Sequence, residues 1–349
     1  MQRLPEPIAL SCSNLTRSPI RNATQVRGGG NSQIWRIETE EGALACKIYF
    51  ADANDKRRRL ETEFGAHTFL WTSGVRNIPE PVSFDSEHKF ALFKFIDGAP
   101  VIGAPITSHD IQSAVEFIQR LFNLSKQTGG YDFSPASEAY FSIRDVIENI
   151  RARLDRLAAI KEDASNADLF RQFSHFVGEE LLIALSSVES AARRNSPGIE
   201  RELSLGQRTL SPSDFGFHNA IRKPTGEIIY IDFEYFGWDD PAKLISDFVI
   251  HPAMKLTDSL SSALVHQLKN VFSSDSTLED RLEAVFPLYG LKWCCIVLNE
   301  FVPEIRARRH FAGKTDASGD SQIMKMQLEK SRLLFQKFCR PGSLREITG

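Results

Sequence analysis

The fold of this chain is decided by Ser213-Asp214-Phe215-Gly216-Phe217-His218-Asn219 and, after an apolar hairpin, by Ile231-Asp232-Phe233-Glu234. These stretches place an aspartate, an asparagine five residues later and a second aspartate eighteen residues after the first. Phosphoryl transfer from ATP needs such groups, because one carboxylate orients and deprotonates the acceptor hydroxyl while an amide oxygen and a second carboxylate hold Mg²⁺ against the phosphates. The pattern therefore predicts a phosphotransferase with Asp214 as catalytic base and with Asn219 and Asp232 as metal ligands.

Composition sets the class of protein. The chain has 349 residues, of which 42% are hydrophobic and 25% charged, and it is long enough for two lobes around a cleft. Its formal net charge of -3 gives no basic field for nucleic acid, so we expect no nucleic-acid partner. Five scattered cysteines have neither disulfide nor zinc-ligand spacing, and the N-terminus does not resemble a signal peptide. The densest apolar run, Trp293 to Leu298, is too short to span a membrane, so we expect a soluble cytoplasmic protein without a membrane partner.

The first part of the chain has the texture of a β-sheet interrupted by one helix. Short β-like runs cover residues 33–38, 43–50 and 90–95, and apolar residues at helical spacing predict a helix over 55–72. Gly98-Ala99-Pro100 ends this texture. We therefore expect a first lobe over residues 1–98.

Helical patterns dominate the second part, over 99–349. They cover residues 108–126, 143–160, 169–194, 257–272, 278–304 and 322–338. The strong β signal here is a hairpin, with strands expected at 217–222 and 228–233 around Pro224-Thr225-Gly226. Such a hairpin brings Asp214, Asn219 and Asp232 together at one of its ends.

A glycine cluster, Gly28-Gly29-Gly30-Asn31-Ser32, lies between two β-like runs, where backbone amides can approach phosphate oxygens. Taken alone, such a cluster is more often a hairpin turn. Lys47 interrupts an apolar run, so it lies either on an exposed strand face or beside a charge partner. The following helix offers Glu63, which we prefer because it is close to the apolar face, and Glu61 as the alternative. Loop, Lys and Glu occur in the order that an ATP-binding lobe requires.

Together these motifs resemble the aminoglycoside phosphotransferase and choline kinase family, a branch of the protein-kinase-like fold. The family pattern H-G-D-x-x-x-x-N is matched at Asp214 and Asn219, and its I-D-[FW]-E strand is matched at 231–234. Residues 234–241 are similar to its E-Y-x-G-x-x-x-P segment, and the match runs in order from about residue 28 to 248.

The resemblance implies a bilobal α+β fold, with an antiparallel sheet and one key helix in the N-terminal lobe and a larger, mostly helical C-terminal lobe. It implies ATP and Mg²⁺ as cofactors. Lys47 and Glu63 would then fix the nucleotide phosphates, and backbone groups from Lys94 to Ile96 would face adenine.

The chain departs from the family pattern at two places. The family's His and Gly before the catalytic Asp are Pro212 and Ser213 here. An Asp expected shortly after the D-P turn is displaced, so Asp247 either braces the catalytic loop or is an ordinary helix residue. His218 lies inside the catalytic segment, and we expect its side chain to point away from Asp214 and to pack.

The resemblance also places the acceptor pocket among the C-terminal helices. Its candidate residues are Trp238, Asp239, Trp293 and Glu300. Acidic and aromatic residues suit a small cationic hydroxyl compound such as an amino sugar or amino alcohol, whereas Lys292 leaves room for a sugar-like or anionic acceptor.

Two other functional classes stay open. Pro212 and Ser213 favour a nucleotide-binding pseudokinase scaffold, although the intact Lys, Asp, Asn and Asp set opposes it. A protein kinase is less favoured, because the chain runs from Asp232 straight on to Pro241 without an activation segment.

Overall fold

The computed structural model describes residues 3–26, 32–50, 57–127, 133–161, 166–196, 198–306 and 319–349. The predicted phosphate-loop residues Gly28, Gly29, Gly30 and Asn31 lie outside these ranges. The chain forms two compact units, one made of Met1–Glu138 with Leu210–Trp238 and the other of Ala139–Thr209 with Asp239–Gly349. The lobe boundary after residue 98 is a different division, and it stays a prediction.

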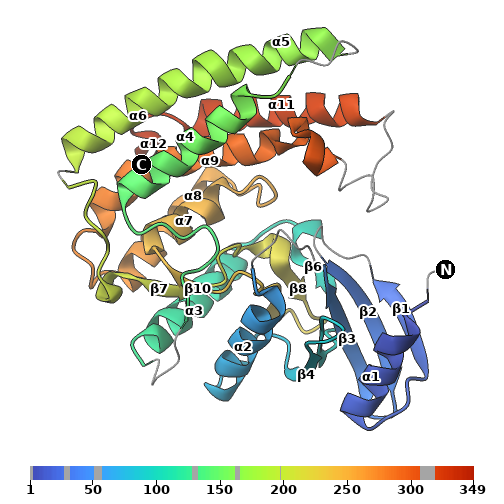
Figure 1. The fold of residues 1–349 in the computed structure, drawn as a ribbon. Coiled ribbons are helices and arrows are strands. Elements are labelled where there is room, and N and C mark those ends of the chain that lie inside the picture. Colours follow the sequence, from blue (N-terminus) through green and yellow to red (C-terminus); the bar gives the residue numbers. More distant parts are fainter. Residues whose placement is uncertain are drawn as a thin grey trace. The chain divides into compact units, whose positions relative to one another are not determined.

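A five-stranded antiparallel sheet organises the first unit (Figure 1). Its order is β1 (Asn22–Val26), β2 (Ser32–Thr39), β3 (Gly42–Tyr49), β5 (Phe90–Lys94) and β4 (Pro81–Asp85). One face packs on Ile8 and Cys12 of helix α1 (Glu6–Thr16), and the other on Leu60 of helix α2 (Arg59–Thr72). Side chains alternate between the faces of a strand, so Cys46 faces α1 whereas Tyr49 faces α2.

The same unit contains a second, three-stranded sheet with the order β6 (Ala99–Pro100), β8 (Ala220–Arg222) and β9 (Ile228–Tyr230). Short helical turns η1 (Val101–Gly103) and η5 (Phe217–Asn219) flank it, together with helix α3 (Ser108–Ser125). The ring of Phe117 on α3 lies 5.4 Å from that of Phe215 and 4.6 Å from that of Tyr230. This aromatic core anchors the segment that carries Asp214. Strands β7 (Thr209–Ser211) and β10 (Gly237–Asp239) pair with each other.

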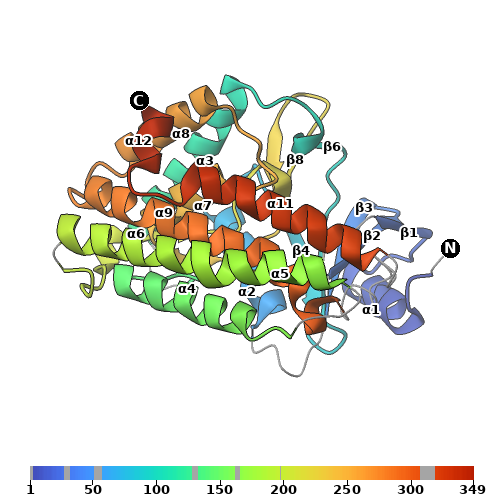
Figure 2. The ribbon, with the colours of Figure 1, turned by 90° about the horizontal axis from the view of Figure 1, so that it is seen from above.

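Helices make up nearly all of the described second unit, and several of the long ones run side by side in Figure 2. They are α4 (Ile143–Ala158), α5 (Ala167–His175) continued by η3 (Phe176–Leu181) and α6 (Leu182–Asn195), α7 (Pro241–Ile250), α8 (Asp258–Val271), α9 (Leu278–Val297) continued by η6 (Leu298–Phe301), α11 (Asp320–Phe338) and α12 (Ser343–Thr348), with the short turn η4 (Leu205–Gln207).

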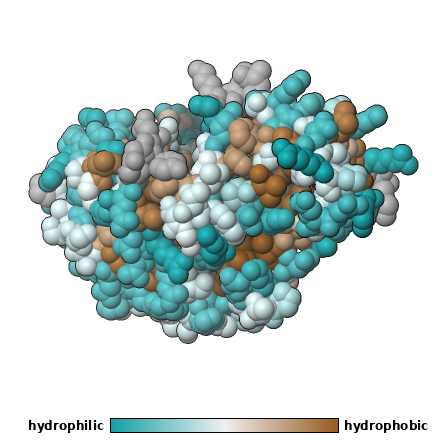
Figure 3. Space-filling model, turned by 90° about the horizontal axis from the view of Figure 1, so that it is seen from below, coloured by the Kyte–Doolittle hydropathy of each residue, from teal (hydrophilic) through white to brown (hydrophobic). Residues whose placement is uncertain are grey.

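The helical stretch Leu278–Phe301 is long and apolar enough to cross a membrane by length and composition, with a mean hydropathy of 1.3. However, 78% of the 18-residue window with this hydropathy is buried inside the protein, which is the environment of a core helix. The helical stretch is longer than the Trp293 to Leu298 run that stands out in the sequence. Figure 3 shows one face of the molecule, which is mostly hydrophilic with smaller hydrophobic areas between.

The predicted α+β class is confirmed by the antiparallel sheet and the helices that follow it. One predicted strand begins later than expected. Residues 217–219 form the helical turn η5, and β8 starts only at Ala220. The sequence patterns did not reveal α1 and α7.

Candidate functional site

The predicted nucleotide, metal and catalytic residues that the structure describes all belong to the first unit. Lys47 lies on β3, Glu63 on α2, and Asn219 at the end of η5. Asp214 precedes η5, and Asp232 follows β9 by two residues. One compact unit therefore fixes the geometry of these side chains relative to one another.

Lys47 lies at the centre of three carboxylates. Its ammonium nitrogen is 2.6 Å from Glu63 Oε2, 2.6 Å from Asp232 Oδ1 and 3.6 Å from Glu234 Oε2. The residue is only 6% exposed, because its strand position faces α2. Burial alone lowers the pKa of the Lys47 ammonium, but the three carboxylates outweigh it and raise this pKa above its ordinary value.

Glu63 is the carboxylate, of the two that the sequence offers on this helix, that contacts Lys47. Its Oε2 also accepts a hydrogen bond of 2.8 Å from the Tyr49 hydroxyl, and its Oε1 accepts one of 3.3 Å from the Phe233 amide. Burial raises the pKa of Glu63, and Lys47 opposes that rise. These bonds fix the helix glutamate and the segment after β9 to the same strand.

Oxygen atoms of Glu63, Asp232 and Glu234 lie within 4.8 Å of one another, and the cation that they surround is the Lys47 ammonium. Carboxylate and amide oxygens are the ligands that Mg²⁺ prefers, so a donor set containing Asp232 fits this metal. Sequence reasoning gave no role to Glu234 or Tyr49. Their positions in the sequence could have identified them, since Glu234 lies two residues after Asp232, and Tyr49 lies two residues after Lys47 on the same strand face.

The loop before Asp214 adopts an uncommon backbone conformation. Ser213 has a φ of 68°, and the Asp214 amide donates a 2.9 Å hydrogen bond to the Pro212 carbonyl. The Ser213 amide donates to the Ser211 hydroxyl at 2.9 Å, and the Ser213 hydroxyl donates to the Ser137 carbonyl at 2.6 Å. A non-glycine residue at positive φ costs about 1–3 kcal/mol, which the surrounding bonds must offset.

Asp232 is a second non-glycine residue at positive φ, with a value of 70°. Positive-φ residues are uncommon, and such strain gathers at functional segments. Four other described non-glycine residues with a positive φ lie elsewhere, at Arg17, Lys89, Glu138 and Lys255, so this conformation alone does not mark the site.

The Asp214 carboxylate contacts two side chains of the turn that follows it. His218 Nε2 lies 2.9 Å from Asp214 Oδ1. The Asn219 amide nitrogen donates to the Asp214 carbonyl at 2.9 Å and lies 3.4 Å from Oδ2. The expectation that His218 points away from Asp214 is therefore wrong. That expectation treated His218 as a spacer in the D-x-x-x-x-N frame, whereas the helical turn η5 brings residue 218 back to residue 214.

The segment predicted to face adenine lies at the end of β5. The Lys94 amide donates to the Glu80 carbonyl at 2.9 Å, and the Phe95 amide to the Ala43 carbonyl at 3.1 Å. Ile96 follows Phe95 in the sequence. Ser32, the described residue of the predicted phosphate loop, begins β2 opposite Tyr49. The nucleotide-binding roles of Ser32, Lys94 and Ile96 stay predictions.

The four residues predicted for the acceptor pocket are divided between the units. Trp238 belongs to the first unit, whereas Asp239, Trp293 and Glu300 belong to the second. Trp238 and Glu300 are buried, with 9% and 7% of their surface exposed.

Asp239 is fully buried, and its Oδ2 accepts a 2.8 Å hydrogen bond from Lys243. This pairing favours a role in holding the start of α7. The indole nitrogen of Trp293 donates at 2.8 Å to Asp247, which also lies 3.3 Å from Lys243. Asp247 is therefore bonded to both α7 and α9. Roles in acceptor binding stay predictions for all four candidates.

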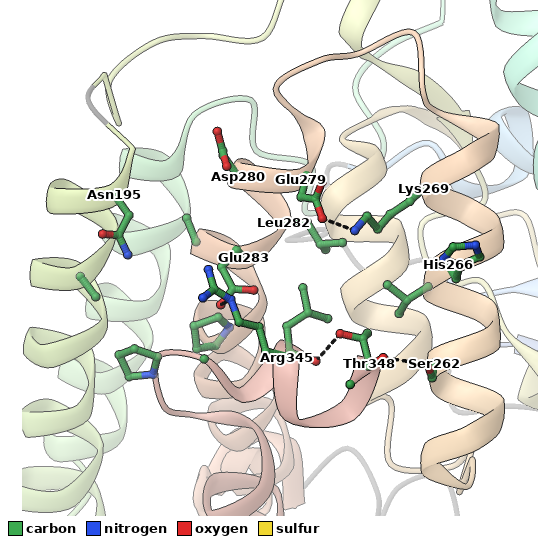
Figure 4. Close-up of a pocket in the computed structure, with 18 of the residues that line it drawn as sticks. Asn195, Ser262, His266, Lys269, Glu279, Asp280, Leu282, Glu283, Arg345 and Thr348 are labelled. Atoms are coloured by element: carbon green, nitrogen blue, oxygen red, sulfur yellow. Dashed lines mark hydrogen bonds and ion pairs between the residues drawn. The ribbon is translucent and has the colours of Figure 1, made fainter.

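A cavity of about 1120 Å³ in the second unit is lined by residues of α6, α8, α9 and α12 (Figure 4). Four of its charged groups form two pairs, since Lys269 contacts Glu279, and Arg345 lies 3.2 Å from Glu283. Its lining includes none of the predicted site residues. Volume alone therefore does not make this cavity the site of phosphoryl transfer.

The sequence of residues 22–282 matches the family described as "Phosphotransferase enzyme family". This match confirms the family resemblance inferred from the motifs. No curated protein matches the chain.

Several solved structures are similar to this one. A spectinomycin phosphotransferase in complex with ADP and spectinomycin has a TM-score of 0.62 at 12% sequence identity, and the match covers 96% of this chain and 100% of that protein. The choline kinase of Streptococcus pneumoniae has a TM-score of 0.55 at 12% identity, with 94% and 98% covered. An ethanolamine kinase of Plasmodium vivax has a TM-score of 0.54 at 12% identity, with 95% and 85% covered. These likenesses show the protein-kinase-like phosphotransferase fold.

Proposed function

Because the chain belongs to the phosphotransferase enzyme family, we propose that it transfers the γ-phosphoryl group of ATP to a hydroxyl group of a small molecule. One observation carries the proposal beyond the family. Lys47 is bonded to Glu63 and Asp232, and the same compact unit holds Asp214 in contact with Asn219. These are the groups that bind phosphates, metal and acceptor in phosphoryl transfer.

In this proposal Asp214 accepts the proton of the acceptor hydroxyl. Its side chain is 41% exposed, so an acceptor can reach it. The amide nitrogen of Asn219 is directed to Asp214, and its oxygen is then the ligand atom for Mg²⁺, together with the Asp232 carboxylate. When bound, Mg²⁺ neutralises phosphate charge, while Lys47, held by Glu63, fixes the nucleotide phosphates.

The proposed acceptors are amino sugars, amino alcohols and sugar-like compounds. Spectinomycin, choline and ethanolamine are named for three structurally similar proteins, and all three compounds carry both hydroxyl and amine or ammonium groups. An aromatic ring such as that of Trp293 and a carboxylate such as that of Glu300 suit a cationic acceptor. We also propose a cytoplasmic location, because the five cysteines are all free thiols, as is usual in a reducing compartment.

The test is an assay of Mg·ATP consumption across spectinomycin, kanamycin, choline, ethanolamine, glucose and adenosine. We expect one of these compound classes to stimulate turnover. Asp214→Asn should lower kcat by about 100-fold or more, because it removes the general base. Asp168→Asn is the matched control, since Asp168 is an exposed carboxylate of the second unit. Full turnover by Asp214→Asn would reject the assignment of the base.

The substitution of Pro212 for the family's His supports a second candidate, a nucleotide-binding scaffold. It predicts that Mg·ATP raises the melting temperature while no compound of the panel stimulates turnover. Incorporation of phosphate into protein substrates would instead indicate a protein kinase.

A further inference from the structure

We propose that His218 is a positioning residue that fixes the carboxylate of Asp214 for proton transfer, an inference that rests on the proposed phosphotransferase function. The imidazole Nε2 lies 2.9 Å from Asp214 Oδ1, within hydrogen-bonding distance. The family pattern places its histidine two residues before the catalytic Asp, where this chain has Pro212, which has no side-chain donor. His218, which follows Asp214 in the sequence, provides a ring donor instead.

The direction of this hydrogen bond follows from chemistry. A carboxylate only accepts hydrogen bonds, so Nε2 must carry the proton that is donated to Oδ1. The Asn219 amide nitrogen lies 3.4 Å from the other oxygen, Oδ2. Both oxygens of Asp214 therefore have a neighbouring donor in one turn, and the plane of the carboxylate is set before an acceptor arrives. Pre-set geometry of this kind lowers the barrier of transfer reactions.

The turn that presents His218 is itself fixed to the core. Phe217 is fully buried, and the backbone amide of Asn219 donates to the Gly216 carbonyl at 3.0 Å. The Ile231 amide donates to the Asn219 carbonyl at 3.0 Å, which ties η5 to the chain leaving β9. The side chain of His218 is 12% exposed, against 41% for Asp214. The donor is thus largely buried, while the proposed base is left accessible.

The first experiment compares His218→Gln with His218→Leu. A Gln amide nitrogen takes a place close to that of imidazole Nε2, whereas Leu has no donor. With the fastest acceptor of the panel, His218→Leu should lower kcat about 10- to 100-fold, the range expected for loss of a hydrogen bond to a charged group. KM for ATP should change less than about twofold, because Lys47 and Glu63 hold the nucleotide end. His218→Gln should recover kcat to within about threefold of the parent protein.

Melting temperatures and a double mutant separate positioning from folding. His218→Leu should add no further loss of kcat in an Asp214→Asn background, because the group it orients is no longer a base. Equal losses in His218→Gln and His218→Leu, or a fully additive double mutant, would overturn the positioning role. An inactive parent protein with an intact fold would instead reject the proposed function.

A second readout needs no acceptor. The ¹⁵N shifts of the His218 imidazole, identified as the signals absent from His218→Gln, should show a proton on Nε2. An Nε2 without a proton would overturn the proposal, whatever the assays of turnover give.

Discussion

Lys47 and Asp232 are 185 residues apart in the sequence, yet the Lys47 ammonium lies 2.6 Å from an oxygen of Asp232. The same ammonium contacts Glu63 at 2.6 Å, which is buried with it. One cation thus joins the sheet, the α2 helix and the proposed metal-binding segment. Lys47 is therefore important both for the fold of the first unit and for the proposed nucleotide site.

Lys47→Met should destabilise the protein by about 3–5 kcal/mol, because removal of one partner of a buried ion pair leaves the other charge uncompensated. The measurement is the free energy of unfolding from urea titration. Lys337→Met is the control, since the Lys337 ammonium pairs with Asp258 at an exposed site, where such pairs contribute about 1 kcal/mol or less. A Lys47→Met protein as stable as the control would contradict the role given to this pair.

Asp232→Asn should weaken Mg²⁺ binding at least about tenfold, because it removes a charged oxygen ligand from the proposed site. Calorimetric titration of the parent and variant proteins with ADP, with and without Mg²⁺, measures this without an acceptor. Glu61→Gln removes a carboxylate from the same unit and should leave the Mg²⁺ dependence unchanged. If Asp232→Asn binds Mg·ADP as the parent protein does, Asp232 is not a metal ligand.

His67 predicts a fall in stability with acid. It is fully buried between the rings of Phe93 and Phe233, each 4.7 Å away, and its Nδ1 lies 2.9 Å from the Glu63 carbonyl. Burial lowers the pKa of His67 to about 4. In the unfolded chain the His67 imidazole has its ordinary pKa of about 6.5, so it takes up a proton at a higher pH than in the folded protein. The stability that neutral His67 gives to the folded protein is complete above about pH 6.5 and is lost as the pH falls to about 4.

The loss amounts to about 3 kcal/mol across that window, because one unit of pKa difference corresponds to about 1.4 kcal/mol. Urea unfolding at several pH values measures it. His67→Phe should flatten the profile between pH 6.5 and pH 4, whereas His175→Asn, at an exposed position, should not. An unchanged slope in His67→Phe would show that other groups cause the acid sensitivity.

Asp110 and Arg222 should stabilise the first unit together. The Asp110 side chain is fully buried, accepts a 2.7 Å hydrogen bond from Arg222 on β8, and completes the capping box of α3 with Thr107. Asp110→Ala should cost about 2–4 kcal/mol, combining a lost cap with an unpaired arginine. Glu116→Ala on the exposed face of α3 is the control, and urea midpoints provide the comparison. A loss below 1 kcal/mol would refute this estimate.

Much of the sheet was predictable, because short apolar runs bounded by turn residues mark β2, β3 and β5. The place of Lys47 inside such a run predicted that it is either exposed or paired, and the structure shows that it is paired with Glu63. Helices α3, α4, α8, α9 and α11 were predictable from their apolar spacing. Nine of the ten residues of α7 are buried, so a helical stripe was not visible there.

The position of His218 was not predictable for a different reason. β-like residues from Phe217 to Arg222 suggested a continuous strand, and a strand that begins at Phe217 would lead His218 away from Asp214. The tight turn η5 follows from long-range contacts, in which Phe217 is buried and Ile231 bonds to Asn219. Local preference does not report such contacts.

The turn from Asp214 to Asn219 has a practical consequence for engineering. Its three polar residues hold one another through bonds within six positions of the chain, so they are best transplanted or retained as a block. A histidine introduced at position 212 would meet a carboxylate whose Oδ1 is already occupied by His218. Libraries aimed at new acceptors should therefore keep this block constant.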